Sequence, residues 1–284
     1  MKKIQKGFIL FLIPLLIMQL LVYIIPIGST VFYAFVNTTG PEAGTFAGLG
    51  NYERVAKDLS STIGRTLVWT IGSIVPAMII GLLAAMLFQG KFRGQKLCIS
   101  LCLVPYTIPL IIVGVCWYFM FQPNFGFINN LLISLGFLEK PMRFLTKTGA
   151  MPSVIVARIW RSMPFAFVSF YAAIKAIPED YFEAASIDGA GEWQSFRFIT
   201  LPQLRPAMLS TGIILTVWTF LVFDIIYTMT GGGPGKATRI LPLAIQRELI
   251  SMYDTGTASA ISLVSILILT VLTVIYWRVM EGDE

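Results

Sequence analysis

Few side chains in this sequence are of the types that perform chemistry in an enzyme. The 284 residues include no histidine, and the three cysteines, Cys98, Cys102 and Cys116, lie in one apolar run. An enzyme site needs a cluster of nucleophiles, bases or metal ligands, and no GxxxxGK[ST] nucleotide loop is present. The sequence therefore predicts a protein that is not an enzyme, has no metal or cofactor of its own and does not hydrolyse ATP by itself.

Three charged residues interrupt otherwise apolar segments and are the first candidates for a functional site. They are Arg158, Arg161 and Asp224. A charge in apolar surroundings is costly and usually faces a cavity or a partner. We therefore expect these side chains in a substrate pathway or at subunit contacts. Pairing of Asp224 with an arginine fits the pattern as well as contact with a substrate does.

The elements that hold these residues are predicted to be membrane helices. Hydrophobic residues make up 56% of the sequence and charged residues only 13%, whereas a soluble domain carries about 25% charge. The net charge of +6 comes from basic residues that mostly flank apolar runs, as they do in membrane proteins. The composition thus predicts an all-α, multi-spanning protein in contact with lipid, and argues against a nucleic-acid partner.

Six segments approach the roughly 20 apolar residues that a spanning helix needs. The first is preceded by charge like a signal peptide, but its apolar stretch is too long, so we expect it to be retained. Turn residues at 122–126 end the third span, and 127–150 is predicted to be an external amphipathic or irregular segment. Residues 1–284 thus form one transmembrane domain with spans at 8–35, 64–88, 97–121, 152–174, 207–229 and 257–277.

Basic residues favour one orientation of these spans. Six spans place both termini on one side. If that side is the cytoplasm, inside segments hold 10 Lys and Arg in 53 residues, against 9 in 86 residues outside. Inside segments are normally enriched in Lys and Arg. We therefore predict a multi-pass protein of a bacterial inner or plasma membrane with both termini cytoplasmic.

Residues 177–206, IPEDYFEAASIDGAGEWQSFRFITLPQLRP, have the pattern of a helix–turn–helix on the cytoplasmic membrane surface. Pro178 suits a first helical position, and the acidic residues after it favour a helix start. Gly189 and Gly191 are expected to break the helix. A second short helix should follow and end at Leu201-Pro202, before the fifth span.

This segment resembles the EAA motif of permease subunits of binding-protein-dependent ABC importers. The pattern of that motif is EAA, then DGA, then I-x-LP. Every one of these elements is present in the segment. The matching residues are Glu183, Ala184, Ala185, Asp188, Gly189, Ala190, Ile199, Leu201 and Pro202.

A second stretch is similar to the end of carbohydrate permeases of the maltose-transporter, MalF-like type. It comprises Phe223-Asp224, the TGGGP run at 230–234 and a YDTGTASA run at 253–260. The earlier GLGNY at 48–52 and Trp160 with Pro164-Phe165 are similar too. The resemblance covers nearly the whole chain, and it implies the type I ABC importer permease fold.

The resemblance also implies partners and roles. Two permease subunits would form the pathway, two ATPase subunits would bind ATP and Mg on the cytoplasmic face, and an extracytoplasmic solute-binding protein would deliver an oligosaccharide-type sugar. The EAA segment would be the helix that docks in the ATPase, where we expect the carboxylate of Glu183 to pair with a basic group.

Several further pathway residues and two other functions also fit the sequence. Aromatic faces often hold sugars, so Trp218, Phe223 and Tyr227 join Asp224, Arg158 and Arg161 as candidates, although ordinary packing also explains each aromatic residue. A glycerol-phosphate, polyol or acidic-sugar permease of the same family is an alternative. A stand-alone secondary transporter is another, but it would need inverted repeats or a relay of carboxylates.

Overall fold

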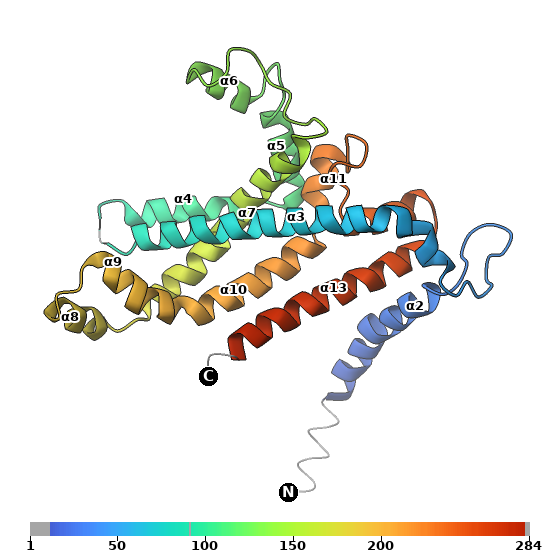
Figure 1. Cartoon of the computed structure of the whole chain (residues 1–284), viewed down its shortest axis with the longest axis horizontal. Helices are drawn as coiled ribbons and strands as arrows, with labels where there is room; N and C mark the ends of the chain where they lie inside the picture. Colours follow the sequence, from blue (N-terminus) through green and yellow to red (C-terminus); the bar gives the residue numbers. More distant parts are fainter. Residues whose placement is uncertain (1–11, 91, 282–284) are drawn as a thin grey trace, which may run out of the picture. The chain divides into compact units, whose positions relative to one another are not determined.

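A computed structural model of the chain describes residues 12–90 and 92–281 (Figure 1). The start of the first predicted span, the basic residues Lys2, Lys3, Lys6 and Lys91, and the last three residues of the acidic tail lie outside this part. Most of the described residues are helical, with no strand among them and one isolated bridge between Val36 and Phe46. They form two compact units. Unit 1 contains the chain up to Ser61 and Leu241–Ile268, and unit 2 contains Thr62–Ile240 and the chain from Leu269 onward.

Within the described ranges, five helices are long and apolar enough to cross a membrane, and a sharply bent helix pair gives a sixth if it counts as one span. The bend between the two members of this pair is 99°. The five helices are Leu12–Tyr33, Gly50–Leu87, Ala150–Lys175, Glu192–Leu221 and Thr255–Arg278, and the bent pair is Gln95–Thr107 with Leu110–Met120.

Unit 1 begins with the helix Leu12–Tyr33, which contains the π-turn η1 (Leu20–Ile24) and then α2 (Ile25–Tyr33). The wide turn directly precedes Pro26, which has no N–H to donate back along the helix. The unit also holds the start of α3 (Gly50–Leu87), which begins well before the predicted residue 64 because no proline or glycine interrupts the polar stretch 51–61. The remaining elements are α12 (Leu241–Gln246), η3 (Arg247–Ser251) and the start of α13 (Thr255–Glu281).

In unit 2, the predicted third span consists of two helices, α4 (Gln95–Thr107) and α5 (Leu110–Met120). Between them, Ile108 has an extended backbone with φ −79° and ψ 132°. A residue before proline is pushed away from helical geometry, so Pro109 accounts for the break. The apolar run continues through the bend, which is why its composition indicates one long span.

The segment after α5 contains the short helix α6 (Phe127–Ser134) and an irregular stretch up to α7 (Ala150–Lys175). The fully buried Asn129 holds it together. Its side chain donates to the carbonyl oxygens of Gln122 and Met142 and accepts from the Met142 N–H at 2.8 Å. This matches the mixed character predicted for residues 127–150.

Beyond α7 the chain forms α8 (Glu179–Ile187) and α9 (Glu192–Ser195). The prediction that Leu201-Pro202 ends the second short helix is wrong, because α9 continues through the π-turn η2 (Phe196–Thr200) into α10 (Leu201–Leu221). Pro202 sits in the first turn of α10, where proline is tolerated. The predicted fifth span is also interrupted, since Val222 is extended and α11 (Asp224–Thr230) starts after it.

The core of unit 2 lies between α3, α7 and α10. Phe167 and Phe170 of α7 are fully buried there with Leu204 and Leu215 of α10. Gly81 of α3 lies directly against α7, since a Cβ added to it would come within 2.8 Å of the Phe167 nitrogen. Small residues of this kind let membrane helices approach closely. Figure 1 shows α7 running from the vicinity of α5 and α11 to the α8–α9 segment.

Candidate functional site

A cavity of about 410 Å³ in unit 2 brings together three of the residues predicted for the pathway, Arg158, Arg161 and Trp218. It lies at the bend between α4 and α5, against α7 and the end of α10. We refer to it as the arginine cavity. Its lining consists of Tyr106, Leu110, Arg158, Arg161, Ser162, Leu215, Trp218, Leu221 and Val222.

Arg158 is only 5% exposed and is held by Thr219. Its Nε and Nη2 atoms both donate to Thr219 Oγ1, at 3.2 Å and 3.0 Å. The Thr219 backbone is fixed in turn by Trp69, whose Nε1 donates to its carbonyl oxygen at 2.9 Å. Two neighbouring helices, α3 and α10, thus position the guanidinium group of Arg158.

Arg161 is half-buried and depends on the α4–α5 bend. Its Nε donates to the carbonyl oxygen of Ile108 at 3.2 Å, and its guanidinium carbon lies 4.5 Å from the centre of the Tyr106 ring. The Ile108 carbonyl is available to a side chain because the α-helix ends there. Pro109 therefore shapes the cavity by creating this acceptor.

Two aromatic residues, Tyr106 and Trp218, line the cavity. Phe165 connects them, since it stacks on Tyr106 with ring centres 6.0 Å apart and contacts Trp218 at 5.0 Å. Trp218 remains 44% exposed. The cavity therefore offers cationic groups and aromatic faces together, a combination that suits a polar ring compound better than a purely apolar ligand.

Ser162 lines the same cavity and was not predicted as a site residue. It is 5% exposed, and its hydroxyl has no hydrogen-bond partner in the described chain. Buried hydroxyl groups are normally paired. Its position directly after Arg161, in a span that already carries two cations, was the available signal.

The structure does not bring the other pathway candidates, Asp224, Phe223 and Tyr227, into the lining of this cavity. Asp224 is the first residue of α11, where a carboxylate is favoured by the helix dipole. It acts electrostatically on Arg158, but the two residues form no ion pair. The expectation that Asp224 lies within a continuous fifth span is wrong, because the break at Val222 separates it from Trp218. Tyr227 is 53% exposed and contacts Phe223 edge-on at 6.2 Å.

The EAA segment forms an exposed helix–turn–helix at the end of α7. Glu183, Ala184 and Asp188 are exposed, and Ala185 and Ala190 are partly buried. Gly189 has a φ of +79°, which favours glycine, and Gln194 Oε1 accepts from the Gly191 N–H at 2.9 Å to start the second helix. The predicted turn is therefore present at these glycines.

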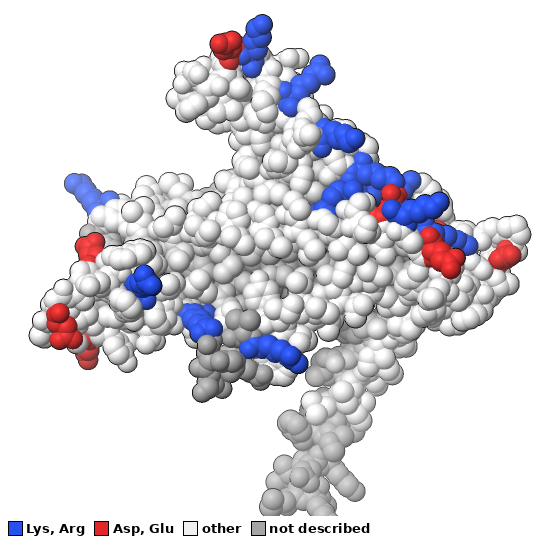
Figure 2. All heavy atoms as spheres, viewed as in Figure 1, with Lys and Arg blue, Asp and Glu red and all other residues white. Residues whose placement is uncertain are grey.

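The surface of this segment combines negative charge with apolar side chains. Figure 2 shows acidic side chains at the α8 end of unit 2. Ile187 is 85% exposed and Trp193 is 69% exposed. Nothing in the described chain covers these side chains. The acidic residues of the segment are Glu179, Asp180, Glu183, Asp188 and Glu192.

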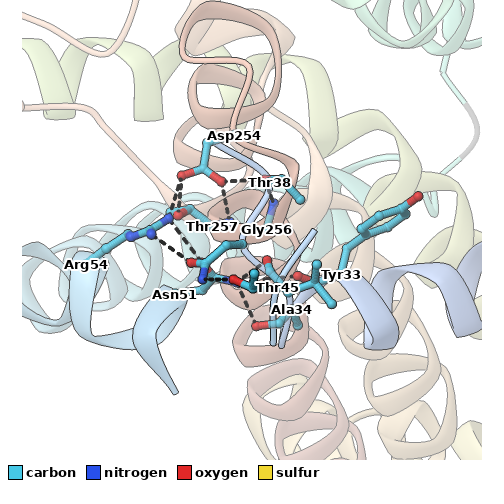
Figure 3. A network of polar contacts seen from close by, with 11 residues as sticks. Tyr33, Ala34, Thr38, Thr45, Asn51, Arg54, Asp254, Gly256 and Thr257 are labelled. Atoms are coloured by element: carbon cyan, nitrogen blue, oxygen red, sulfur yellow. Dashed lines mark hydrogen bonds and ion pairs between the residues drawn. The ribbon is translucent and has the colours of Figure 1, made fainter. Parts of the chain in front are cut away.

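A second polar cluster, in unit 1, was not predicted (Figure 3). It ties the chain after α2 to the starts of α3 and α13. Asp254 accepts hydrogen bonds from Thr38 Oγ1 at 2.9 Å, from the Thr257 N–H at 3.0 Å and from Thr257 Oγ1 at 2.7 Å. We call this cluster the Asp254 network, and its members are Asn37, Thr38, Asn51, Arg54, Asp254 and Thr257.

Arg54 and Asn51 complete the Asp254 network. Arg54 forms an ion pair with Asp254 at 3.4 Å and donates to Asn37 Oδ1 at 2.9 Å. The fully buried Asn51 donates to the carbonyl oxygens of Ala34 and Val36 at 3.0 Å and 2.9 Å. Asn51 belongs to the GLGNY run and Asp254 to the YDTGTASA run. The two runs that carried part of the family resemblance thus meet in space.

Residues 77–280 match the family described as binding-protein-dependent transport system inner membrane component. The match covers more than half of the chain.

The chain belongs to this family.

Curated relatives extend the match over nearly the whole permease. It is 33% identical to the trehalose/maltose transport system permease protein MalF of Thermococcus litoralis, over 98% of this chain and 94% of that protein. It is 31% identical to the sulfoquinovosyl glycerol transport system permease protein SmoG of Agrobacterium fabrum, over 97% and 91%. It is also 33% identical to the diacetylchitobiose uptake permease DasB of Streptomyces coelicolor, over 84% and 74%.

Solved structures confirm the fold of the permease. A chain of a bacterial ABC transporter that imports the acidic polysaccharide alginate superimposes with a TM-score of 0.85, covering 99% of this chain and 98% of that one. The sequence identity is 21%, so this likeness concerns the fold. The predicted all-α ABC importer permease fold is confirmed. Membership in a family of binding-protein-dependent transport components contradicts the alternative of a stand-alone transporter.

Proposed function

We propose that this permease is one of two membrane-spanning subunits of an ATP-driven carbohydrate importer, and that its exposed α8–α9 segment transmits ATPase movement to the pathway. One observation carries the proposal. The exposed segment with the EAA residues directly follows α7, the helix that contributes Arg158 and Arg161 to the arginine cavity.

The geometry of α7 supports direct mechanical coupling. Arg161 and Lys175 lie on the same helix, so about 20 Å of continuous α-helix, which contains Pro164, separates the cavity from the start of the coupling segment. A displacement of α8 would move α7 as a body, which is how packed helices commonly transmit a conformational change. Closure of two ATPase subunits would then alter the cavity without any chemistry in this chain.

The exposed surface of α8 supports a docking role. Glu183 and Ile187 leave a charge and a large apolar side chain uncovered at the tip of unit 2. Exposed apolar groups with a charged rim are typical of protein contacts. A cleft in the ATPase with a basic residue would complement them. We further propose a second permease subunit and an extracytoplasmic binding protein as partners.

The carbohydrate class is supported by the three relatives. Their names specify trehalose or maltose, diacetylchitobiose and sulfoquinovosyl glycerol. The aromatic rings of Tyr106, Phe165 and Trp218 beside the arginine cavity are suited to sugar rings. A polyol or glycerol-phosphate permease is the neighbouring alternative, and a transport assay with both ligand classes separates them.

The proposed topology has the coupling segment and both termini in the cytoplasm. Single cysteines at Ser186 and Tyr253, introduced after the three native cysteines are replaced by alanine, test it, because both positions are exposed and Tyr253 is 78% exposed. A membrane-impermeant thiol reagent added outside intact cells should label a cysteine at 253 and leave one at 186 unlabelled. Labelling of both from the same side would contradict the topology.

The coupling role is tested by reversing the charge of Glu183. Glu183→Lys should weaken ATPase binding by about 2–5 kcal/mol if the carboxylate pairs with a buried base. The readout is the amount of ATPase that co-purifies with the membrane-inserted permease. Glu139→Lys is the matched control, because Glu139 is exposed after α6, outside the coupling segment. Normal co-purification and transport by Glu183→Lys would remove this role.

A further inference from the structure

Two guanidinium groups share the arginine cavity without a carboxylate partner among the described residues. Two N–H groups of Arg158 donate to Thr219, and one of Arg161 donates to Ile108. A guanidinium group has five N–H donors. Most of the donors of this pair therefore have no acceptor in the described chain.

This arrangement is unfavourable for an empty protein interior. Arg158 is 5% exposed, and a cation at that depth is normally paired with an anion. Arg161 lies close enough to add repulsion. Asp224 supplies some negative potential, but it forms no ion pair with either arginine and does not line the cavity. Positive charge is therefore left uncompensated at this point.

The remaining lining adds groups that recognise a sugar. The buried Ser162 hydroxyl lies in the same cavity without a partner. Arg158, Arg161 and Ser162 occupy one side of α7, since they are three and four residues apart. Trp218 of α10 lines the same cavity. Cations, a free hydroxyl and an aromatic face thus converge on one space.

We propose that the arginine cavity binds the anionic group of an acidic carbohydrate, a carboxylate or a sulfonate, through Arg158 and Arg161. The inference rests on the proposed transport function and specifies its substrate class. Guanidinium groups bind such anions through paired N–H···O hydrogen bonds. A volume of about 410 Å³ is within the range of small-molecule sites. Ser162 would accept or donate a hydrogen bond to a ring hydroxyl, and Trp218 would cover a ring face.

The test uses the complete importer, with its ATPase and binding protein, in proteoliposomes. The probes are digalacturonate and related uronate oligosaccharides, each compared with its methyl-esterified form, which differs chiefly in charge. We expect uptake of uronate probes. Arg161→Gln should lower that uptake about 10- to 100-fold, as expected for loss of a charged hydrogen bond, and Arg161→Lys should lower it less. Arg93→Gln is the control, because Arg93 is exposed between α3 and α4.

The outcomes separate the two proposals. Uptake of the neutral probes alone, unchanged in Arg161→Gln and Arg158→Gln, would overturn the acidic-substrate inference and leave sugar import intact. Uptake of maltose or trehalose without uptake of any uronate probe would also overturn only the acidic-substrate inference. Failure to take up every probe, these two sugars included, with no stimulation of ATP hydrolysis, would count against the proposed transport function. If the glutamine variants fail to assemble and neutralising a carboxylate of the second permease restores assembly, that carboxylate is the partner anion and the inference is wrong.

Discussion

The permease contains two clusters of charged residues that differ in how completely their charges are paired. In the Asp254 network, the carboxylate accepts three hydrogen bonds and an ion pair, and Arg54 is shared with two asparagine side chains. In the arginine cavity, Arg158 donates only to the Thr219 hydroxyl, Arg161 donates only to the Ile108 carbonyl oxygen, and the Ser162 hydroxyl has no partner in the described chain. Charge that is satisfied locally stabilises the fold, whereas unsatisfied charge around an open volume is available to a ligand.

The position of each cluster agrees with this difference. The Asp254 network joins Thr38 to Asp254 across 216 residues and closes unit 1. Its members fix the backbone where α2 ends and where α3 and α13 begin. The arginine cavity lies at a helix break, with α7 leading directly to the coupling segment. The Asp254 network therefore holds three chain segments together, whereas the arginine cavity lies where a movement of α7 would change its shape.

The largest stability effect is expected from Asp254→Ala. This change leaves Thr257 N–H and the hydroxyl of Thr38 without their acceptor and Arg54 without its ion pair. Losing hydrogen bonds to a charged group costs about 1.5–3 kcal/mol. The unfolding midpoint of the purified complex in an SDS titration measures the loss. Glu248→Ala is the control, because Glu248 is partly buried and its ion pair with Arg247 joins two adjacent residues, so it should contribute less than about 1 kcal/mol.

A smaller loss is expected from Gly256→Ala. A Cβ at this position would lie 2.6 Å from the Val36 carbonyl oxygen and 2.8 Å from Asn51 Nδ2. Overpacking of this kind costs about 1–3 kcal/mol. Gly28→Ala, in α2, is the matched control, since nothing lies within 4 Å of its added Cβ. Equal midpoints for the two variants would show that the network tolerates displacement.

Arg161→Gln should change stability least among the substitutions that remove a charge. The side chain is half-buried and makes one hydrogen bond through Nε, so we expect a change within about 0.5–1 kcal/mol. The helix content from circular dichroism and the SDS unfolding midpoint of Arg161→Gln are compared with those of Asp254→Ala. A loss of stability as large as that of Asp254→Ala would mean that the cavity arginine is a structural residue.

The smallest effect concerns pH. Burial alone would raise the pKa of Asp254, but the hydrogen bonds from Thr257 and Thr38 and the charge of Arg54 outweigh it and lower the pKa below its ordinary value of 3.8. The stabilisation is therefore complete above that value and is lost as pH falls through the lower folded-state pKa. Between pH 7 and 3, the unfolding midpoints of wild type and Asp254→Asn should converge only below about pH 4. Parallel curves would contradict this assignment.

The sequence predicted the helices and the coupling segment better than the two clusters. The long apolar runs predicted the spanning helices, and Gly189 predicted the turn within the EAA segment. The break at Ile108-Pro109 was hidden because the apolar run continues across it. The helix through Pro202 was not predicted, because proline normally ends a helix by its missing N–H and its clash with the preceding turn. Here the wider π-turn η2 precedes Pro202 and accommodates it.

The Asp254 network was beyond sequence reasoning for a different reason. Its members are polar residues of common types, and they form a network only because the fold brings positions about 200 residues apart into contact. The sequence alone does not indicate which of these positions meet. The arginine cavity was predicted in part, since Arg158, Arg161 and Trp218 were chosen for charge and ring character. Asp224 is separated from these three residues by the helix break at Val222. No proline or glycine at this position indicates the break in the sequence.

One experiment tests the contrast between the clusters most directly. The complete importer is prepared with Arg161→Gln and with Asp254→Asn, and for each variant both the SDS unfolding midpoint and the sugar uptake per assembled complex are measured. We predict that Arg161→Gln keeps the wild-type midpoint and loses uptake, whereas Asp254→Asn lowers the midpoint and keeps uptake per complex. The reverse pattern, or loss of both properties in both variants, would contradict the assignment of one cluster to stability and the other to transport.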